Sequence, residues 1–173
     1  MAKTGHPGYT VFNTEAGWVA VLASEKGIKR LTMPQRTAGQ ARELLGVEIR
    51  DAELPPSFPE NIIKRLRRFF QGSKTAFPDI CDLGEATPFQ RRVWEITRQI
   101  PYGETRSYRW VAERVGQKNA ARAVGQALAR NPVPIIIPCH RVVASDGGLG
   151  GYSGGLSFKR FLLDLEAKRT RHI

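Results

Sequence analysis

The first third of the chain alternates apolar and polar residues in short runs, which is the pattern of half-buried strands. The runs cover residues 9–13, 18–23 and 28–33. Turn signals that contain glycine separate them at residues 15–17 and 25–27. The pattern therefore predicts a small antiparallel sheet.

Apolar residues recur with helical spacing after this sheet. We expect a short helix at about residues 38–45 and a longer one over residues 60–70, with the proline-rich residues 54–59 as the connector between them. The longer helix is predicted to end before Gly72. Its buried side would be formed by Ile62, Ile63, Leu66, Phe69 and Phe70.

The periodic pattern disappears over residues 77–86, where we place a linker. It separates an N-terminal α/β lobe, residues 1–80, from a C-terminal domain, residues 87–170. The first helix of that domain is expected over residues 89–100, because Thr87-Pro88 offers an N-cap followed by a proline in the first turn.

Two further short helices joined by a tight turn form a helix-turn-helix candidate. Ser107 is placed to cap the first, which runs to about residue 115, and the second runs from residue 119 or 120 to residue 130. The second helix has small side chains on nearly all sides, so its backbone can closely approach another helix or a nucleic-acid groove. Arg122, near its start, favours a contact with DNA.

The composition indicates a folded protein with a strongly basic net charge. With 173 residues, 41% of them hydrophobic, the chain is long enough to bury a core. Its 27 Lys and Arg against 16 Asp and Glu give a net charge of +11, which favours a polyanionic partner. The basic residues are interleaved with apolar ones, so each run also fits a solvated helix face. Charge alone leaves DNA, RNA and an acidic membrane open.

The sequence shows no sign of export or of a metal. Residues 1–10 lack the apolar stretch of a secretory signal, and the longest apolar run, residues 133–137, is too short to span a membrane. We expect an intracellular protein, in the cytoplasm or with the nucleoid or nucleus. Two cysteines, Cys81 and Cys139, and three scattered histidines form neither a disulfide framework nor a metal-ligand cluster, so no metal is expected.

Cys139 is the strongest candidate for chemistry. A buried, strand-like run over residues 133–140 is predicted to bring this thiol to the end of a core element. A lone buried cysteine is usually inert unless a base activates it. His140 is adjacent, but successive side chains in a strand point to opposite faces. The two therefore cooperate only if the chain turns after Pro138 or a water bridges them.

Two later segments complete the candidate site. A C-terminal helix over residues 157–167 offers Asp164 and Glu166, either of which orients a base or lies at the surface. The Gly-rich loop, residues 147–155, lacks the spacing of a phosphate-binding loop and is predicted to form the wall of a pocket for a flat ligand. The apolar stripe of the helix is expected to consist of Phe158, Phe161, Leu162 and Leu165.

The run Pro138-Cys139-His140-Arg141-Val142 closely resembles the cysteine motif of the O6-alkylguanine-DNA alkyltransferase family. Asn131-Pro132-Val133-Pro134 and Gly151-Tyr152-Ser153-Gly154-Gly155-Leu156 extend the resemblance, which covers residues 87–166. It implies an α+β fold. A small antiparallel-sheet lobe, ribonuclease-H-like, would precede a mainly helical lobe that carries the helix-turn-helix and the active-site cysteine.

The resemblance also implies an activity. It is DNA repair by direct, irreversible transfer of an alkyl group from O6-alkylguanine in double-stranded DNA to Cys139, after base flipping. Each molecule would act once, as a monomer and without a cofactor. O4-alkylthymine is a second candidate substrate.

Four residues would carry the chemistry in this family. Cys139 is implied to be the alkyl acceptor, and His140 to deprotonate it through a water. Glu166 would orient His140. Asn131 would form the hinge between the recognition helix and the cysteine segment.

The implied contacts with DNA come mainly from two side chains. Arg122 would enter the base stack in place of the flipped guanine, and Tyr108 would rotate the 3′ phosphate and protonate guanine N3. Further DNA contacts are implied for Ala121, Ala123 and Gly125, and the guanine pocket would be lined by Tyr152, Ser153 and Gly154.

Two departures and two alternatives remain. Some family members bind zinc in the N-terminal lobe, but this lobe has only His6 before Cys81, and the turn at residues 116–119 is not the Gly-Asn-Pro-Lys typical of the family. One alternative is a non-catalytic, lesion-sensing DNA-binding homologue, which would lack the acceptor Cys139. The other is a cysteine hydrolase using Cys139 and His140, which would leave the charge and the helix-turn-helix unexplained.

Overall fold

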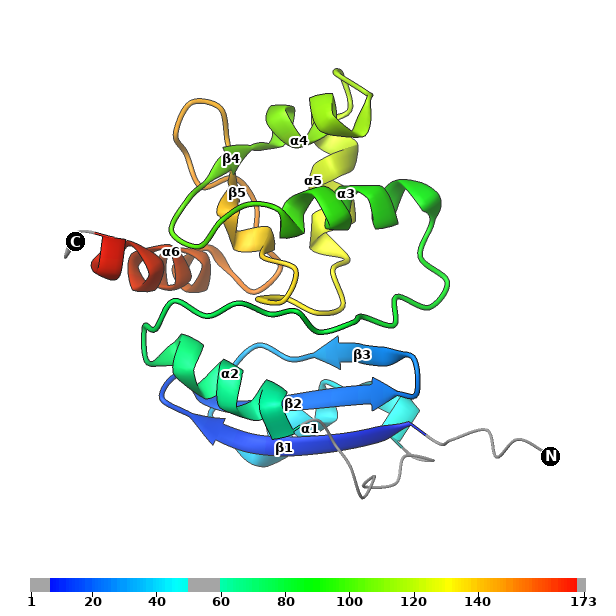
Figure 1. Ribbon diagram of the computed structural model, residues 1–173, viewed down its shortest axis with the longest axis vertical. Coiled ribbons are helices and arrows are strands. Elements are labelled where there is room, and N and C mark those ends of the chain that lie inside the picture. The colour runs from blue at the N-terminus through cyan, green and yellow to red at the C-terminus, as the bar shows by residue number, and fades with distance from the viewer. Residues whose placement is uncertain (1–6, 50–59, 171–173) are drawn as a thin grey trace. The chain divides into compact units, whose positions relative to one another are not determined.

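The computed structural model describes residues 7–49 and 60–170 (Figure 1). The chain divides into two compact units, Met1–Gly84 and Glu85–Ile173. Each unit has its own secondary structure and its own core, and each is described by itself below.

The first unit is built on a three-stranded antiparallel sheet in the order β1 (Gly8–Thr14), β2 (Gly17–Ser24), β3 (Gly27–Leu31). The register pairs Thr14 with Gly17 and Ser24 with Gly27, so two-residue turns join the strands. Both glycines have positive φ, a conformation that favours glycine, and a Cβ at Gly17 would lie 2.6 Å from the carbonyl oxygen of Gln35. The predicted antiparallel sheet is confirmed.

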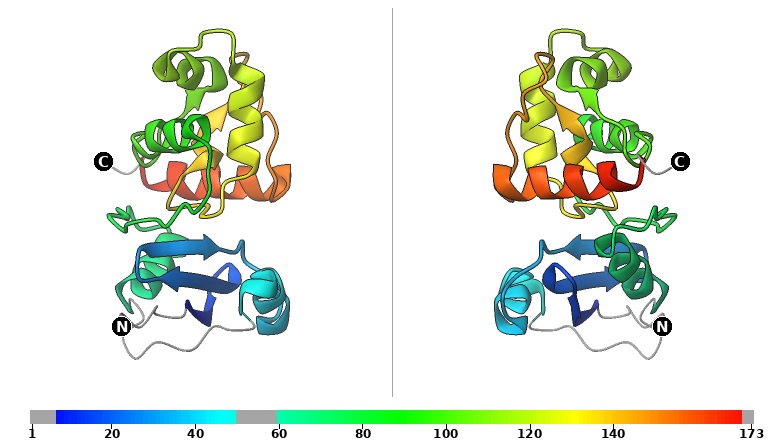
Figure 2. Two further views of the ribbon diagram at one scale, coloured as in Figure 1. Left: turned by 90° about the vertical axis from the view of Figure 1, so that its right-hand side faces the viewer. Right: turned by 90° about the vertical axis from the view of Figure 1, so that its left-hand side faces the viewer.

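Helices α1 (Ala38–Glu43) and α2 (Glu60–Phe70) cover opposite faces of this sheet (Figures 1 and 2). The α1 side has a core of Ala20, Leu22, Ala41 and Leu45. Helix α1 ends earlier than predicted, and a short 3-10 helix, Gly46–Ile49, follows. The predicted connector at residues 54–59 lies outside the described residues.

The second unit is mainly helical, with α3 (Pro88–Arg98), α4 (Tyr108–Val115), α5 (Ala121–Ala129) and α6 (Leu156–Thr170). Thr87 and Ser107 cap α3 and α4 as predicted, because their side chains accept backbone N–H groups of the first turn. A two-residue parallel pair joins β4 (Arg106–Ser107) to β5 (Val142–Val143). In the part of the chain that is described, no helix is long and apolar enough to cross a bilayer.

Residues 133–138 do not form the predicted strand. They are folded into turns, with Ile135 at a φ of 74°. Proline at 134 and 138 removes two backbone donors, and Asn131 supplies side-chain partners in place of a ladder. Its Nδ2 donates to Ile137 O (2.8 Å) and its Oδ1 accepts from Val133 N (2.9 Å). The segment is nevertheless buried, so the burial was predicted correctly and the conformation was wrong.

Candidate active site

Cys139 begins a 3-10 turn, η2 (Cys139–Arg141), directly after Pro138. The chain therefore turns at the cysteine, which is the condition under which Cys139 and His140 can act together. The thiol is only 5% exposed and borders a cavity of about 620 Å³. Helices α4 and α5 and the loop after β5 line this cavity through Tyr108, Ala121, Arg122, Gly125, Gln126, Leu128, Ala129, Gly151, Tyr152 and Ser153.

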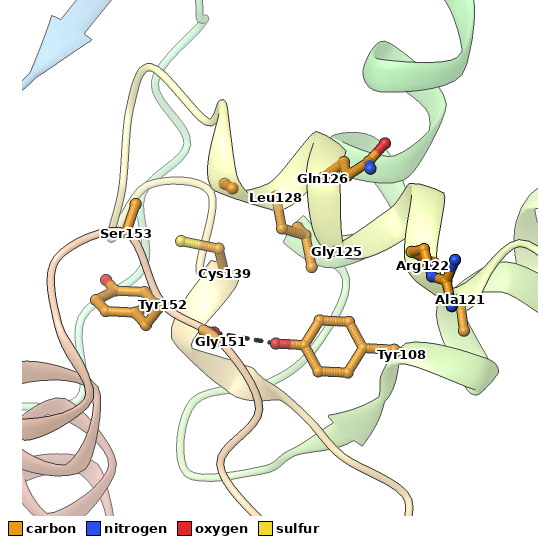
Figure 3. A pocket seen from close by; sticks show the side chains of 11 residues that line it. Tyr108, Ala121, Arg122, Gly125, Gln126, Leu128, Cys139, Gly151, Tyr152 and Ser153 are labelled. Atoms are coloured by element: carbon orange, nitrogen blue, oxygen red, sulfur yellow. Dashed lines mark hydrogen bonds between the residues drawn. The ribbon is translucent and has the colours of Figure 1, made fainter.

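The side chains divide the cavity into two ends (Figure 3). Cys139 points its sulfur toward the end formed by Tyr152 and Ser153, whereas Arg122 lies at the opposite end, beyond Tyr108. Tyr108 projects from α4 to the loop and donates a hydrogen bond to Gly151 O at 3.1 Å. Aromatic rings beside the thiol give the cavity the shape and polarity that suit a planar heterocycle.

A buried polar network lies around η2. Nε2 of His140 is 2.7 Å from Oε1 of Glu166, and both side chains are excluded from solvent. Arg141 donates to both carboxylate oxygens of Glu166, at 2.9 to 3.2 Å. The backbone N–H of Gly103 donates to Oε2 at 3.0 Å. Helix α6 thus supplies one carboxylate that three donors hold in place.

These contacts fix the charges of the network. Burial alone would raise the pKa of Glu166, but the hydrogen bonds and charges of His140 and Arg141 outweigh it and lower that pKa to about 2. Burial lowers the pKa of His140, and Glu166 only partly offsets this effect. Glu166 is therefore ionised and His140 neutral near pH 7. An ionised carboxylate only accepts hydrogen bonds, so Nε2 of His140 carries the proton and Nδ1 carries the lone pair.

The resting state of Cys139 is the neutral thiol. Burial raises its pKa, and hydrogen bonds with the side chains of Asn131 and Tyr152, together with the positive charge of Lys159, only moderate the increase. The thiol therefore needs a base at the moment it reacts.

Lys159 is a functional candidate that the sequence analysis missed. Its side chain is fully buried, and Nζ donates to the carbonyl oxygens of Val142 (2.6 Å), Leu149 and Gly151 (3.2 Å) and to the hydroxyl of Tyr108 (3.3 Å). It therefore connects α6 to the Gly-rich loop and to the cavity wall. The sequence did offer a sign of this role, because Lys159 interrupts the apolar residues near the start of α6.

Comparison with known proteins gives the family. Residues 88–168 match the family model described as the DNA-binding domain of 6-O-methylguanine DNA methyltransferase. The methylated-DNA–protein-cysteine methyltransferase of Methanosarcina barkeri is 39% identical over 169 residues, which cover 94% of this chain and 99% of that protein. The chain belongs to the methylated-DNA–protein-cysteine methyltransferase family.

Solved structures of this family agree with the fold. The Mycobacterium tuberculosis O6-methylguanine methyltransferase is 37% identical, with a TM-score of 0.77 over 94% of each chain. The M. tuberculosis OGT crystallised in complex with DNA is also 37% identical, with a TM-score of 0.78 over 93% of each chain. The predicted α+β class, with a small antiparallel sheet and a mainly helical remainder, is confirmed.

The site residues predicted from the family resemblance are not all gathered in one place. Ala121, Arg122 and Gly125 line the cavity beside Cys139, but Ala123 faces a separate cavity of about 220 Å³ between α3 and α5. Gly154 is exposed and is not among the residues lining either cavity. Asp164, the other carboxylate considered for orienting the base, is exposed on α6.

Gly150 keeps the cavity wall close to Tyr108. A Cβ added at Gly150 would lie 2.6 Å from Cε2 of Tyr108, and the residue has a left-handed φ of 70°. We predict that Gly150→Ala lowers the free energy of unfolding by about 1–3 kcal/mol, measured by urea denaturation. Gly151→Ala is the matched control, because a Cβ there meets nothing within 4 Å. Equal losses in the two variants would contradict the close packing at Gly150.

Proposed function

We propose that the protein repairs DNA by transferring an alkyl group from O6 of guanine to its own Cys139, once per molecule. The observation that carries this proposal is the buried thiol at a cavity with two aromatic walls, next in sequence to a neutral histidine held by an ionised carboxylate. Membership of the methyltransferase family supports the same reaction.

The proposed step is a displacement at the alkyl carbon. Sγ of Cys139 forms a bond to that carbon while the bond from carbon to O6 breaks, so the electron pair leaves with the guanine. The thiol proton passes through a water to Nδ1 of His140, the nitrogen that carries the lone pair. Tyr108 supplies a proton to N3 of the departing guanine. Sulfur suits this step because a soft thiolate attacks saturated carbon well.

Glu166 and Asn131 act as positioning residues in this scheme. Glu166 fixes the orientation and tautomer of His140 through the 2.7 Å hydrogen bond. Asn131 holds the turns at residues 133–137, which place Cys139 at the cavity. The product is a thioether with no carbonyl for water to attack, so the protein is not regenerated.

The cavity reaches an alkylated guanine only when the nucleotide is rotated out of the duplex. We assign α5 to the minor groove, where Ala121, Ala123 and Gly125 permit close approach of the backbone. Arg122, at the far end of the cavity from Ser153, would fill the space left in the stack. The guanine would lie against Tyr152 and Ser153, with Gly154 following in the loop.

Charge supports the same assignment. Residues 85–173 carry 15 Lys and Arg against seven Asp and Glu, so most of the net charge of +11 lies in the unit that contains the cavity. We assign residues 87–170 as the alkyltransferase domain and residues 1–80 as an accessory lobe, joined through residues 77–86. The protein would work as a monomer on chromosomal DNA, in the cytoplasm or nucleus.

The proposed function is tested with a duplex that contains one O6-methylguanine. After incubation, mass spectrometry is expected to find one additional methylene mass on the peptide that contains Cys139, and none on the peptide that contains Cys81. The methyl count should stop at one per protein molecule. Continued turnover, or binding to the duplex without any adduct, would contradict the proposal.

A further inference from the structure

Arg141 is the one charged residue of the cysteine motif to which the proposed reaction gives no role. Its side chain is buried, with 7% of the residue exposed. Nε donates to both oxygens of Glu166, at 3.2 and 3.0 Å, and Nη2 donates to Oε1 at 2.9 Å. Nη1 donates to the carbonyl oxygen of Ile100 at 2.7 Å. The guanidinium carbon lies 5.7 Å from the ring centroid of Tyr102.

These contacts make Glu166 a shared acceptor. Its Oε1 takes the hydrogen bonds of His140 and Arg141, while Oε2 takes those of Arg141 and Gly103. Arg141 therefore contributes, together with His140 and Gly103, to the position of the Glu166 carboxylate, and it favours the ionised form of that carboxylate. A guanidinium is suited to this because it stays ionised and presents a planar fork to a carboxylate.

Burial is the main cause of the lowered pKa of His140, and the charges around the ring adjust that pKa. Among the described residues, the charged groups that act on His140 are Glu166 and Lys159 from α6 and Arg141 from η2. Glu166 favours the imidazolium, whereas Arg141 and Lys159 oppose it. Without Arg141, the negative charge of Glu166 would act on His140 without opposition from the guanidinium, so the pKa of His140 would rise. At acidic pH a larger fraction of His140 would then be protonated and unable to accept the thiol proton.

We propose that Arg141 is a positioning residue for alkyl transfer, which helps to hold Glu166 in place and offsets part of its charge, and thereby favours the neutral form of His140. The inference rests on the proposed function, since it assigns the state of the base in that reaction.

The test is the pH profile of the single-turnover rate, with free O6-benzylguanine as the probe, because it presents an alkylated guanine without DNA. Arg141→Gln is expected to move the midpoint of the acidic limb upward by about one pH unit, because the pKa of His140 rises when the opposing charge is removed. At pH values on that limb, the rate of Arg141→Gln should be about tenfold below the wild-type rate. At higher pH it should return to nearly the wild-type rate. Arg141→Lys keeps the positive charge, so the midpoint of its acidic limb should be that of the wild type. Arg92→Gln removes an exposed arginine of α3 as a control.

A rate loss in Arg141→Gln that is the same at every pH would show a merely structural role and overturn the inference. Equal shifts of the midpoint in Arg141→Gln and Arg141→Lys would also overturn the inference. The wild-type protein gives a second measurement that does not depend on the variants folding. Nitrogen chemical shifts of His140 at pH 7 should show a proton on Nε2 and an unprotonated Nδ1. The chemical shifts of an imidazolium would overturn the inference. The methyl adduct on wild-type Cys139 tests the proposed function separately.

Discussion

Replacing Cys139 with serine is expected to abolish alkyl transfer while leaving binding to duplex DNA unchanged. The hydroxyl is almost isosteric with the thiol, but it is a far weaker nucleophile toward saturated carbon and is much harder to deprotonate. We expect the transfer rate to fall by roughly 10⁴-fold or more. Binding should persist because Arg122 and Tyr108 are unchanged. The rate is measured by mass spectrometry of the protein after incubation with an O6-methylguanine duplex, and the affinity by fluorescence anisotropy.

Cys81→Ser is the matched control, because Cys81 lies in the first unit and borders neither cavity that is described. This variant should transfer and bind as the wild type does. Alkyl transfer that survives in Cys139→Ser and disappears in Cys81→Ser would identify the other cysteine as the acceptor.

Replacing Glu166 with alanine is expected to cause a large loss of stability in the second unit. The carboxylate is 1% exposed and accepts hydrogen bonds from His140, Arg141 and Gly103. Its removal leaves the Arg141 guanidinium buried without its counter-ion, which typically costs about 3–5 kcal/mol. Urea denaturation at pH 7 measures the loss. Asp164→Ala, on the exposed side of the same helix, should change the free energy of unfolding by only about 0.5 kcal/mol or less.

This difference depends on pH in a defined direction. The pKa of Glu166 is about 2 in the folded protein, compared with an ordinary value of 4.5. Its contribution to stability is therefore fully present above pH 4.5 and is lost as the pH falls toward 2. The wild-type protein should approach the stability of Glu166→Ala over this range. A stability difference that is independent of pH would contradict the ion pair.

Local signals in the sequence predicted the fold well where the chain's own neighbours decide the structure. Thr87 and Ser107 are caps because their side chains satisfy N–H groups of the next turn, and that requires only a few residues. The hairpin glycines are equally local. The same holds for the periodicity that predicted α2 over Glu60–Phe70. Such features do not depend on which distant segment packs against them.

Two predictions failed, the first for a local reason and the second because of distant partners. Residues 133–138 look like a strand because they are apolar, but Asn131 and the two prolines fold them into turns. In α6 the sequence suggested an apolar stripe that included Phe161, yet Phe161 is 40% exposed. The buried face of α6 instead consists of Lys159, Leu162 and Glu166. Periodicity could not show this, because the partners of the two charged side chains come from other segments of the unit, among them η2, β5 and α4.

The burial of Cys139 also bears on how long the protein survives before it is used. A molecule that reacts once needs an intact sulfur until it meets a lesion, in a cell that contains peroxides and diffusible electrophiles. Those reagents consume thiolates, and accessible ones first. Cys139 is 5% exposed, and burial raises its pKa, so it rests as a shielded thiol. In the proposed reaction the thiol would lose its proton to His140 only at the moment of transfer, so Cys139 would be protected from these reagents until the protein meets a lesion.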